Sequence, residues 1–115
     1  MSRTIWRLSL ETYNKPFQLY LPVGALFLTV QPQFGMPQIW FEVNYQKERE
    51  YRFFRFLETD EIIPESCKVY LGTIILKPGH KGLHLYEESK SESHIGVAEF
   101  EFQDNVTVLQ LVGTA

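Results

Sequence analysis

Two stretches of alternating apolar residues, joined by a short turn-forming segment, constrain the fold of this chain most. The apolar positions are Leu26, Leu28 and Val30 in the first stretch, and Ile39, Phe41 and Val43 in the second. Successive side chains of a β-strand point to opposite faces, so each stretch offers one apolar face. The segment 32–37 between them contains two prolines and a glycine, which favour a turn. The sequence therefore predicts a β-hairpin at the centre of an all-β core.

The same period of two recurs along most of the chain, in segments 4–10, 17–21, 50–57, 68–77, 83–87, 94–102 and 106–112. No segment of helical length spaces its apolar positions by three and four residues. We therefore predict an all-β, single-domain fold over residues 1–115, either an antiparallel β-sandwich or a partly open barrel of about eight or nine short strands. The large residues predicted to be mostly buried are Trp6, Leu28, Val30, Ile39, Phe41, Leu71 and Phe100.

Composition narrows the class of protein. A chain of 115 residues suits one domain. The single cysteine, Cys67, excludes an intramolecular disulfide. No apolar run approaches the roughly 18 residues of a membrane span, and the first ten residues lack the apolar centre of a signal peptide. We expect a cytoplasmic protein that does not act in a membrane.

Acidic residues are concentrated near the C-terminus. Residues 1–86 hold ten Lys and Arg against eight Asp and Glu, a net charge of +2, whereas residues 87–115 hold one Lys against six acids, a net charge of -5. The six acids are Glu87, Glu88, Glu92, Glu99, Glu101 and Asp104. We predict that residues 88–115 form a C-terminal β-hairpin. Its carboxylates either form an ordinary solvated strand face or present a surface that docks on a basic groove of a partner.

Arginines and aromatic residues are interleaved in the segment 47–56. Rings and guanidinium groups together suit a nucleotide or single-stranded nucleic acid, so Arg52, Arg55, Tyr51 and Phe54 are candidate ligand-binding residues. In a strand, however, Arg52 and Phe54 lie on one face while Tyr51 and Arg55 lie on the other. The alternative is an ordinary strand whose arginines extend over apolar neighbours.

The chain contains no motif that predicts catalysis or a resident cofactor. It has no GxSxG, P-loop, GxGxxG or HExxH sequence. His80 and His84 lie about 13 Å apart if the strand is regular, too far to share a metal ion unless the 78–82 loop folds back. Cys67 has no catalytic signature around it. We therefore predict a protein that is not an enzyme, with no catalytic residues, no metal site and no cofactor.

A set of short motifs in one order resembles a family of small phage and prophage proteins that has no assigned activity. The motifs are TIWR at 4–7, LPVGA at 21–25, LTVQ at 28–31, GMP at 35–37 followed by Trp40, YLGT at 70–73 and HLYE at 84–87. They cover residues 4–87, so residues 88–115 are interpreted as an addition to the family pattern. The resemblance implies a phage or mobile-element origin, and hence the cytoplasm of a bacterial host, but no catalytic residues.

The leading hypothesis is a non-enzymatic phage accessory protein that binds a host factor and inhibits a bacterial defence system, anti-CRISPR-like or otherwise. The partner would be a nucleic-acid-binding or defence protein, met by an acidic surface that imitates nucleic acid, with no direct binding of nucleic acid. The alternatives are a binder that sequesters a nucleotide signal, and a minor virion protein. Nine Phe, six Tyr and two Trp are many for this length. We therefore also expect a homo-oligomer, with a dimer favoured, that covers part of this aromatic surface.

Overall fold

The computed structural model of the chain describes residues 2–89 and 110–111, and every regular element in these ranges is a β-strand. The strands are β1 (Arg3–Ser9), β2 (Phe17–Pro22), β3 (Leu26–Gln33), β4 (Met36–Asn44), β5 (Arg49–Glu58), β6 (Cys67–Ile74), β7 (Leu83–Glu88) and β8 (Gln110–Leu111). No helix in these ranges is long and apolar enough to cross a membrane.

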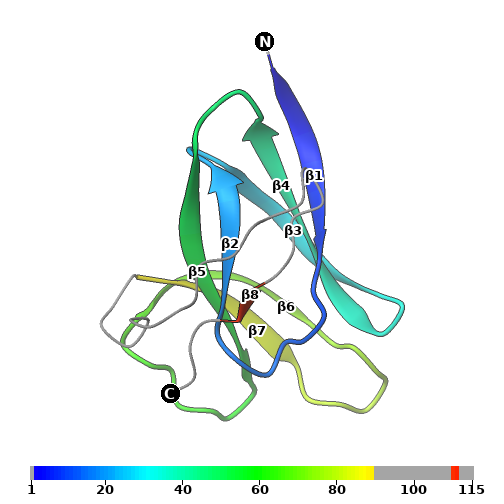
Figure 1. Cartoon of the computed structure of the whole chain (residues 1–115). Helices are drawn as coiled ribbons and strands as arrows, with labels where there is room; N and C mark the ends of the chain where they lie inside the picture. Colours follow the sequence, from blue (N-terminus) through cyan, green and yellow to red (C-terminus); the bar gives the residue numbers. More distant parts are fainter. Residues whose placement is uncertain (1, 90–109, 112–115) are drawn as a thin grey trace.

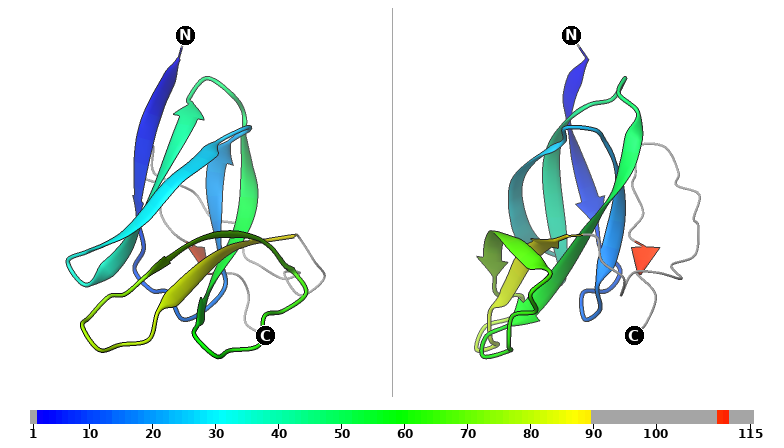
Figure 2. Two further views of the ribbon diagram at one scale, coloured as in Figure 1. Left: turned by 180° about the vertical axis from the view of Figure 1, so that it is seen from behind. Right: turned by 90° about the vertical axis from the view of Figure 1, so that its left-hand side faces the viewer.

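The strands form two antiparallel sheets that pack as a sandwich (Figure 1). Sheet A has the order β1-β4-β3, and sheet B has the order β6-β7-β5-β2-β8. Sheet B is strongly twisted, so that β6 and β7 run obliquely across one end of the molecule (Figure 2). The sheets do not close into a barrel. The all-β prediction is confirmed, and the sandwich is the correct one of its two forms.

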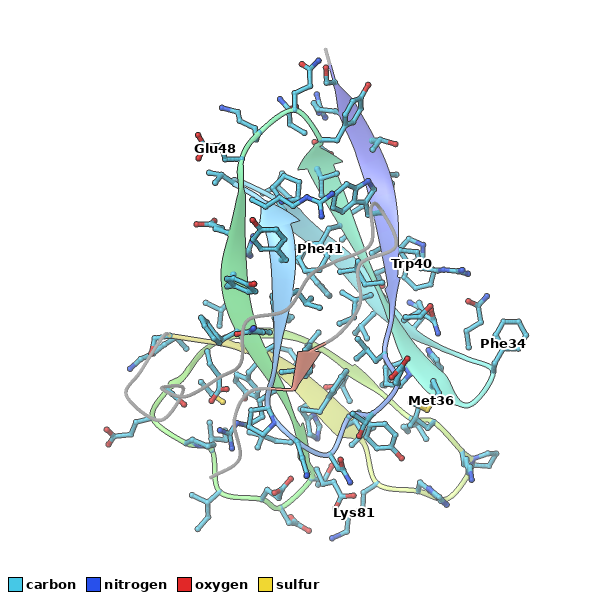
Figure 3. The ribbon with its side chains drawn as sticks, in the orientation of Figure 1. Phe34, Met36, Trp40, Phe41, Glu48 and Lys81 are labelled. Carbon is cyan, nitrogen blue, oxygen red and sulfur yellow. The ribbon has the colours of Figure 1, made fainter. Side chains whose placement is uncertain are left out.

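Alternation decides which side chains face the interior of the sandwich. Trp6 and Leu8 of β1 pair with Phe41 and Ile39 of β4, and all four are buried. In Figure 3, Phe41 lies on the side of β4 that faces β2 and β5, and Trp40 lies on the opposite side. Residues of β1 and β4 in the other phase therefore form an outer face of sheet A.

Phenylalanine rings connect the two sheets through the core. From sheet A, Phe27 contacts Phe41 edge to face with 5.9 Å between ring centroids, and Phe41 contacts Phe54 of sheet B at 6.0 Å. Phe17 stacks on Phe54 at 5.7 Å and lies 6.0 Å from Phe56. Such contacts add to the hydrophobic gain of burying the rings. Part of the high aromatic content, from which we expected an uncovered aromatic surface, therefore lies in this core.

A β-bulge in β3 overturns one prediction about the core. The register of β3 against β4 shifts between Phe27 and Thr29, which leaves Leu28 without a partner residue on β4. Leu26 consequently pairs with Glu42 on the outer face, whereas Val30 pairs with Ile39 on the inner face. Leu28 is 44% exposed, so its predicted burial is wrong. The bulge reverses the phase of the strand, which simple alternation cannot anticipate.

The turn between β3 and β4 is shorter than the sequence suggested. We expected the segment 32–37 to interrupt the strands, but Pro32 pairs with Pro37, and Gln33 pairs with Met36. Only Phe34 and Gly35 form the loop, both with positive φ, at 55° and 78°. Two positive φ angles in a two-residue loop define a type I′ hairpin turn. Phe34 therefore stands at the end of a ladder that remains regular up to its last pair.

The other core predictions have different outcomes. Trp6, Val30, Ile39 and Phe41 are buried as predicted, while Leu71 is only partly buried against the core. Phe100 and most of the predicted hairpin 88–115 lie outside the described residues. Within that segment, the short strand β8 pairs with β2. Gly72 marks both a register shift in β6 and a close approach, since a Cβ there would lie 3.1 Å from Val30 Cγ1.

Candidate functional site

Arg52, a predicted ligand-binding residue, lies on the inner face of β5. Its Nε and Nη2 donate to the two carboxylate oxygens of Glu87 at 2.7 and 2.8 Å, and its Nη1 donates to the carbonyl of Ala25 at 2.6 Å. The guanidinium carbon also lies 5.7 Å from the ring centroid of Phe41 and 5.9 Å from that of Phe54. Arg52 thus connects β5 to β7 and to the β2–β3 turn. In this arrangement its donors serve internal contacts.

Arg55 lies on the opposite face of sheet B. Its Nε donates to Glu88 Oε2 at 3.0 Å, and the same oxygen accepts a hydrogen bond from Ser66 Oγ at 2.6 Å. The side chain of Glu88 is fully buried, whereas that of Arg55 is partly exposed. Arg55 therefore retains an accessible part, while Glu88 belongs to the interior of this cluster.

Cys67 lies beside the same carboxylate, with its Sγ 3.8 Å from Glu88 Oε2. Burial, reinforced by the negative charge of Glu88, raises the pKa of the Cys67 thiol to about 11. The thiol therefore stays protonated near neutral pH. A protonated thiol is a poor nucleophile, which fits a structural role for this cysteine.

The two predicted ligand-binding aromatics are also separated. Phe54 is fully buried in the core beside Arg52, whereas Tyr51 is half-buried on the outer face and packs on Tyr20 with 4.8 Å between ring centroids. The structure therefore divides the four candidate residues between the two faces of β5, as the alternation indicated, and does not gather them into one ligand site.

The predicted docking carboxylates have two outcomes. Glu87 and Glu88 are held in the internal ion pairs with Arg52 and Arg55. Glu88 is buried, so it does not present its charge on the surface. The other four residues, Glu92, Glu99, Glu101 and Asp104, lie outside the described residues. Their role as a docking surface stays a prediction.

A pocket of about 310 Å³ opens beside Arg55, between the β1–β2 connection and the end of β5. Its charged lining residues are Lys15, Arg55, Glu58 and Glu61, and its apolar lining includes Phe56 and Leu83. The carboxylate of Glu61 accepts a hydrogen bond from the Glu58 backbone amide at 2.6 Å. Lys15 and Arg55 can hold an anionic group of a small ligand, and Glu58 and Glu61 balance their charge in the empty pocket.

The outer face of sheet A carries exposed apolar residues. Ile5 of β1 pairs with Glu42, Arg7 pairs with Trp40, and Leu26 of β3 also pairs with Glu42. Ile5 is 60% exposed and Leu26 is 59% exposed, and they lie on either side of Glu42, two residues along β4 from the half-buried Trp40. Arg3 Nε donates to Glu42 Oε2 at 2.7 Å. We call Ile5, Arg7, Leu26, Trp40 and Glu42 the sheet A face.

The sequence contains a signal for this face. Alternation assigns Ile5 and Arg7 to the phase opposite Trp6, and Trp40 to the phase opposite Phe41. Tryptophan is enriched at protein interfaces, so a tryptophan in the outward phase of a strand indicates a candidate interaction surface. What the sequence could not show is that β1, β4 and β3 are neighbours, which brings these residues together.

His84 belongs to a chain of hydrogen bonds on the outer face of sheet B. Its Nδ1 lies 2.8 Å from Thr73 Oγ1, its Nε2 lies 2.8 Å from Thr59 Oγ1, and the hydroxyl of Tyr70 also bonds Thr73. Each ring nitrogen of His84 therefore forms a hydrogen bond with a threonine hydroxyl group. Within residues 2–89 and 110–111, no three His, Cys, Asp or Glu side chains are placed to hold a metal ion.

Comparison with known proteins identifies a family. Residues 1–96 match the domain of unknown function DUF7352. The chain belongs to this family. No curated protein and no solved structure matches it.

The DUF7352 match includes all seven strands from β1 to β7, and with them the sheet A face and the pocket beside Arg55. Glu99, Glu101 and Asp104 follow the last matched residue. The two surfaces described above thus belong to the DUF7352 domain, whereas three of the predicted docking carboxylates lie beyond it.

Proposed function

We propose that this DUF7352 protein is a non-enzymatic binding protein that docks on a host protein through the sheet A face. The observation that carries the proposal is the position of Trp40, half-buried on the outside of a three-stranded sheet, on the same face as the exposed aliphatic residues Ile5 and Leu26. The class of partner, a component of a bacterial defence system that the protein inhibits, rests on the resemblance to phage and prophage proteins.

The composition of the face fits a protein interface. Interfaces combine an apolar centre with a polar rim, and their strongest contributions come most often from Trp, Tyr and Arg. Here Trp40 lies on the middle strand with Arg7 directly opposite it, and Glu42 lies on the same strand between Ile5 and Leu26, where it is paired with Arg3. The residues project from paired strands, so little conformational freedom is lost when they meet a partner.

The proposal predicts that Trp40→Ser weakens binding to the partner about 30-fold, the size of an interface hot spot. The partner is first identified by affinity purification from host cells and mass spectrometry, and the purified pair is then titrated by calorimetry. Ile75→Ser is the matched control, because Ile75 is an exposed aliphatic residue outside the sheet A face. Equal affinity for wild type and Trp40→Ser would remove the sheet A face from the proposal.

The salt dependence of binding separates this face from the acidic segment. Docking through Ile5, Leu26 and Trp40 changes little with ionic strength, whereas docking through a row of carboxylates weakens as salt rises, since screening sets in beyond about 10 Å at 0.1 M. A steep salt dependence together with an unaffected Trp40→Ser variant would favour the C-terminal carboxylates as the docking surface.

The pocket beside Arg55 supports a second candidate function, binding of a nucleotide or a similar anionic ligand. We expect Lys15→Met to weaken binding of a nucleoside phosphate at least about tenfold, by removing a charge-assisted hydrogen bond. Lys15 is exposed, so this variant leaves the Arg55–Glu88 pair intact. Titration with a panel of nucleoside mono-, di- and triphosphates provides the measurement, with Lys77→Met as the control. If none of these nucleoside phosphates binds the wild-type protein, this candidate function is excluded.

A further inference from the structure

The tip of the β3–β4 hairpin holds an aromatic residue where hairpins normally carry Asn, Asp or Gly. Phe34 has a φ of 55° and Gly35 a φ of 78°, the two positive angles of a type I′ turn. The left-handed region brings Cβ close to the carbonyl oxygen that follows, so a bulky residue is strained there. The turn itself therefore gives no reason for a phenylalanine at this position.

Packing gives no reason either. Phe34 is 91% exposed, the highest exposure among the large apolar residues of the described ranges. In Figure 3 its ring extends from the end of the hairpin, away from both sheets. A strained backbone at a residue that stabilises nothing in the fold points to a function outside it.

The base of the tip is held rigidly. The last two pairs of the ladder are Pro32 with Pro37 and Gln33 with Met36, and the proline rings restrict both strands. From β1, Arg7 Nη1 donates to Gln33 Oε1 at 3.4 Å. The ring of Phe34 is thus presented on a fixed support, which lowers the entropy lost when it is bound.

We propose that Phe34 is an anchor that inserts into an apolar pocket of the protein partner, next to the contact made by the sheet A face. This inference rests on the proposed function. It adds Phe34 to the contact and states that an apolar recess of the partner receives its ring. Met36 and Trp40 are four residues apart on β4 and therefore point to the same outer face. The tip therefore continues the sheet A face beyond the edge of the sandwich.

The charge of the tip indicates what receives it. The ten residues from Gln31 to Trp40 contain no Lys, Arg, Asp or Glu, and the cation beside them, Arg7, donates to Gln33 at the base of the tip. An anionic membrane or a nucleic acid would call for several cationic residues around the ring, not one at the base of the hairpin. The partner's recess is accordingly apolar with an uncharged polar rim.

A second copy of this chain is a poorer match. The pocket beside Arg55 has four charged residues in its lining. A second pocket, next to His84, has Leu57, Ile63 and Tyr86 in its lining together with the acids Glu58, Asp60 and Glu61. A shallow third is lined by Arg3, Thr4, Ile5 and Glu42. None of these three pockets offers the uncharged recess that the tip requires. The proposal therefore commits to a different protein as the occupant.

The test separates stability from binding. Phe34→Asn places the residue most suited to this turn at the strained position, so we expect its melting midpoint to equal or exceed that of wild type. Its affinity for the purified partner should fall at least about tenfold. The matched control is Ile62→Asn, at a loop residue that is 90% exposed, and its affinity should be unchanged. A lower melting midpoint for Phe34→Asn would show that the ring stabilises the fold, and would overturn the proposal.

A photoreactive benzophenone amino acid in place of Phe34 tests the identity of the occupant. The expected result is an adduct with the same protein that wild type binds, mapped to an apolar recess. An adduct with a second copy or with lipid, or no adduct, would overturn the proposal. If Phe34→Asn binds the partner as tightly as wild type, the anchor fails while the proposed function stands. If wild type has no protein partner, both fail.

Discussion

Phe41→Ala should lower the free energy of unfolding by about 3–5 kcal/mol, the usual cost of truncating a buried Phe. Phe41 is fully buried and lies between Phe27 of its own sheet and Phe54 of sheet B, so its loss opens a cavity at the point where the two sheets meet. Because domains of this size are stable by only about 5–15 kcal/mol, the variant would lose a large share of its stability. Urea unfolding followed by tryptophan fluorescence measures the change.

The neighbouring residue provides the control for this prediction. Trp40 precedes Phe41 in β4 and points to the outer face, so Trp40→Ala should cost clearly less stability than Phe41→Ala although tryptophan is the larger side chain. The contrast tests the assignment of the two faces. Equal losses, or a larger loss for Trp40→Ala, would mean that the inner and outer faces of sheet A have been exchanged.

Glu87→Leu should lower the free energy of unfolding by about 2–3 kcal/mol, because it leaves the guanidinium of Arg52 without its two charge-assisted hydrogen bonds. This estimate is lower than the cost of breaking a fully buried pair, since both side chains remain about one-fifth exposed. The same urea titration measures it. A loss below about 0.5 kcal/mol would show that water replaces the carboxylate without cost.

Two further variants complete the test of the Arg52–Glu87 pair. The double variant Arg52→Met with Glu87→Leu should recover most of the loss, because an apolar pair of similar volume removes the uncompensated charge. Glu42→Leu breaks the more exposed pair with Arg3 and should cost no more than about 1 kcal/mol. Together the three variants separate the effect of an internal charge from that of an ion pair at the surface.

The sequence predicted the kind of element and most of the inner faces. The period of two placed Trp6, Ile39 and Phe41 in the core and divided Arg52 from Arg55 across β5. These results depend only on the geometry of an extended backbone, which every strand shares. The same rule places Trp40 on the outer face of sheet A.

The rule failed where the backbone departs from a regular strand. The bulge at Leu28 reversed the phase of β3 and moved Leu26 to the outer face. The prolines at 32 and 37 joined the ladder, so that the turn contracted to Phe34 and Gly35. Both departures depend on how β3 is paired with β4, which a local pattern does not contain.

The sequence by itself determined that this chain forms strands, that these strands bury one phase of their side chains, and that the chain belongs to a family of unknown function. Only the tertiary structure decided which residues of different strands meet. It paired Arg52 with Glu87, 35 residues along the chain, and brought Ile5, Trp40 and Leu26 to one surface. The physical reason is that alternation arises within a strand, whereas ion pairs and surfaces arise from strand order and register, which are settled by packing of the whole sandwich.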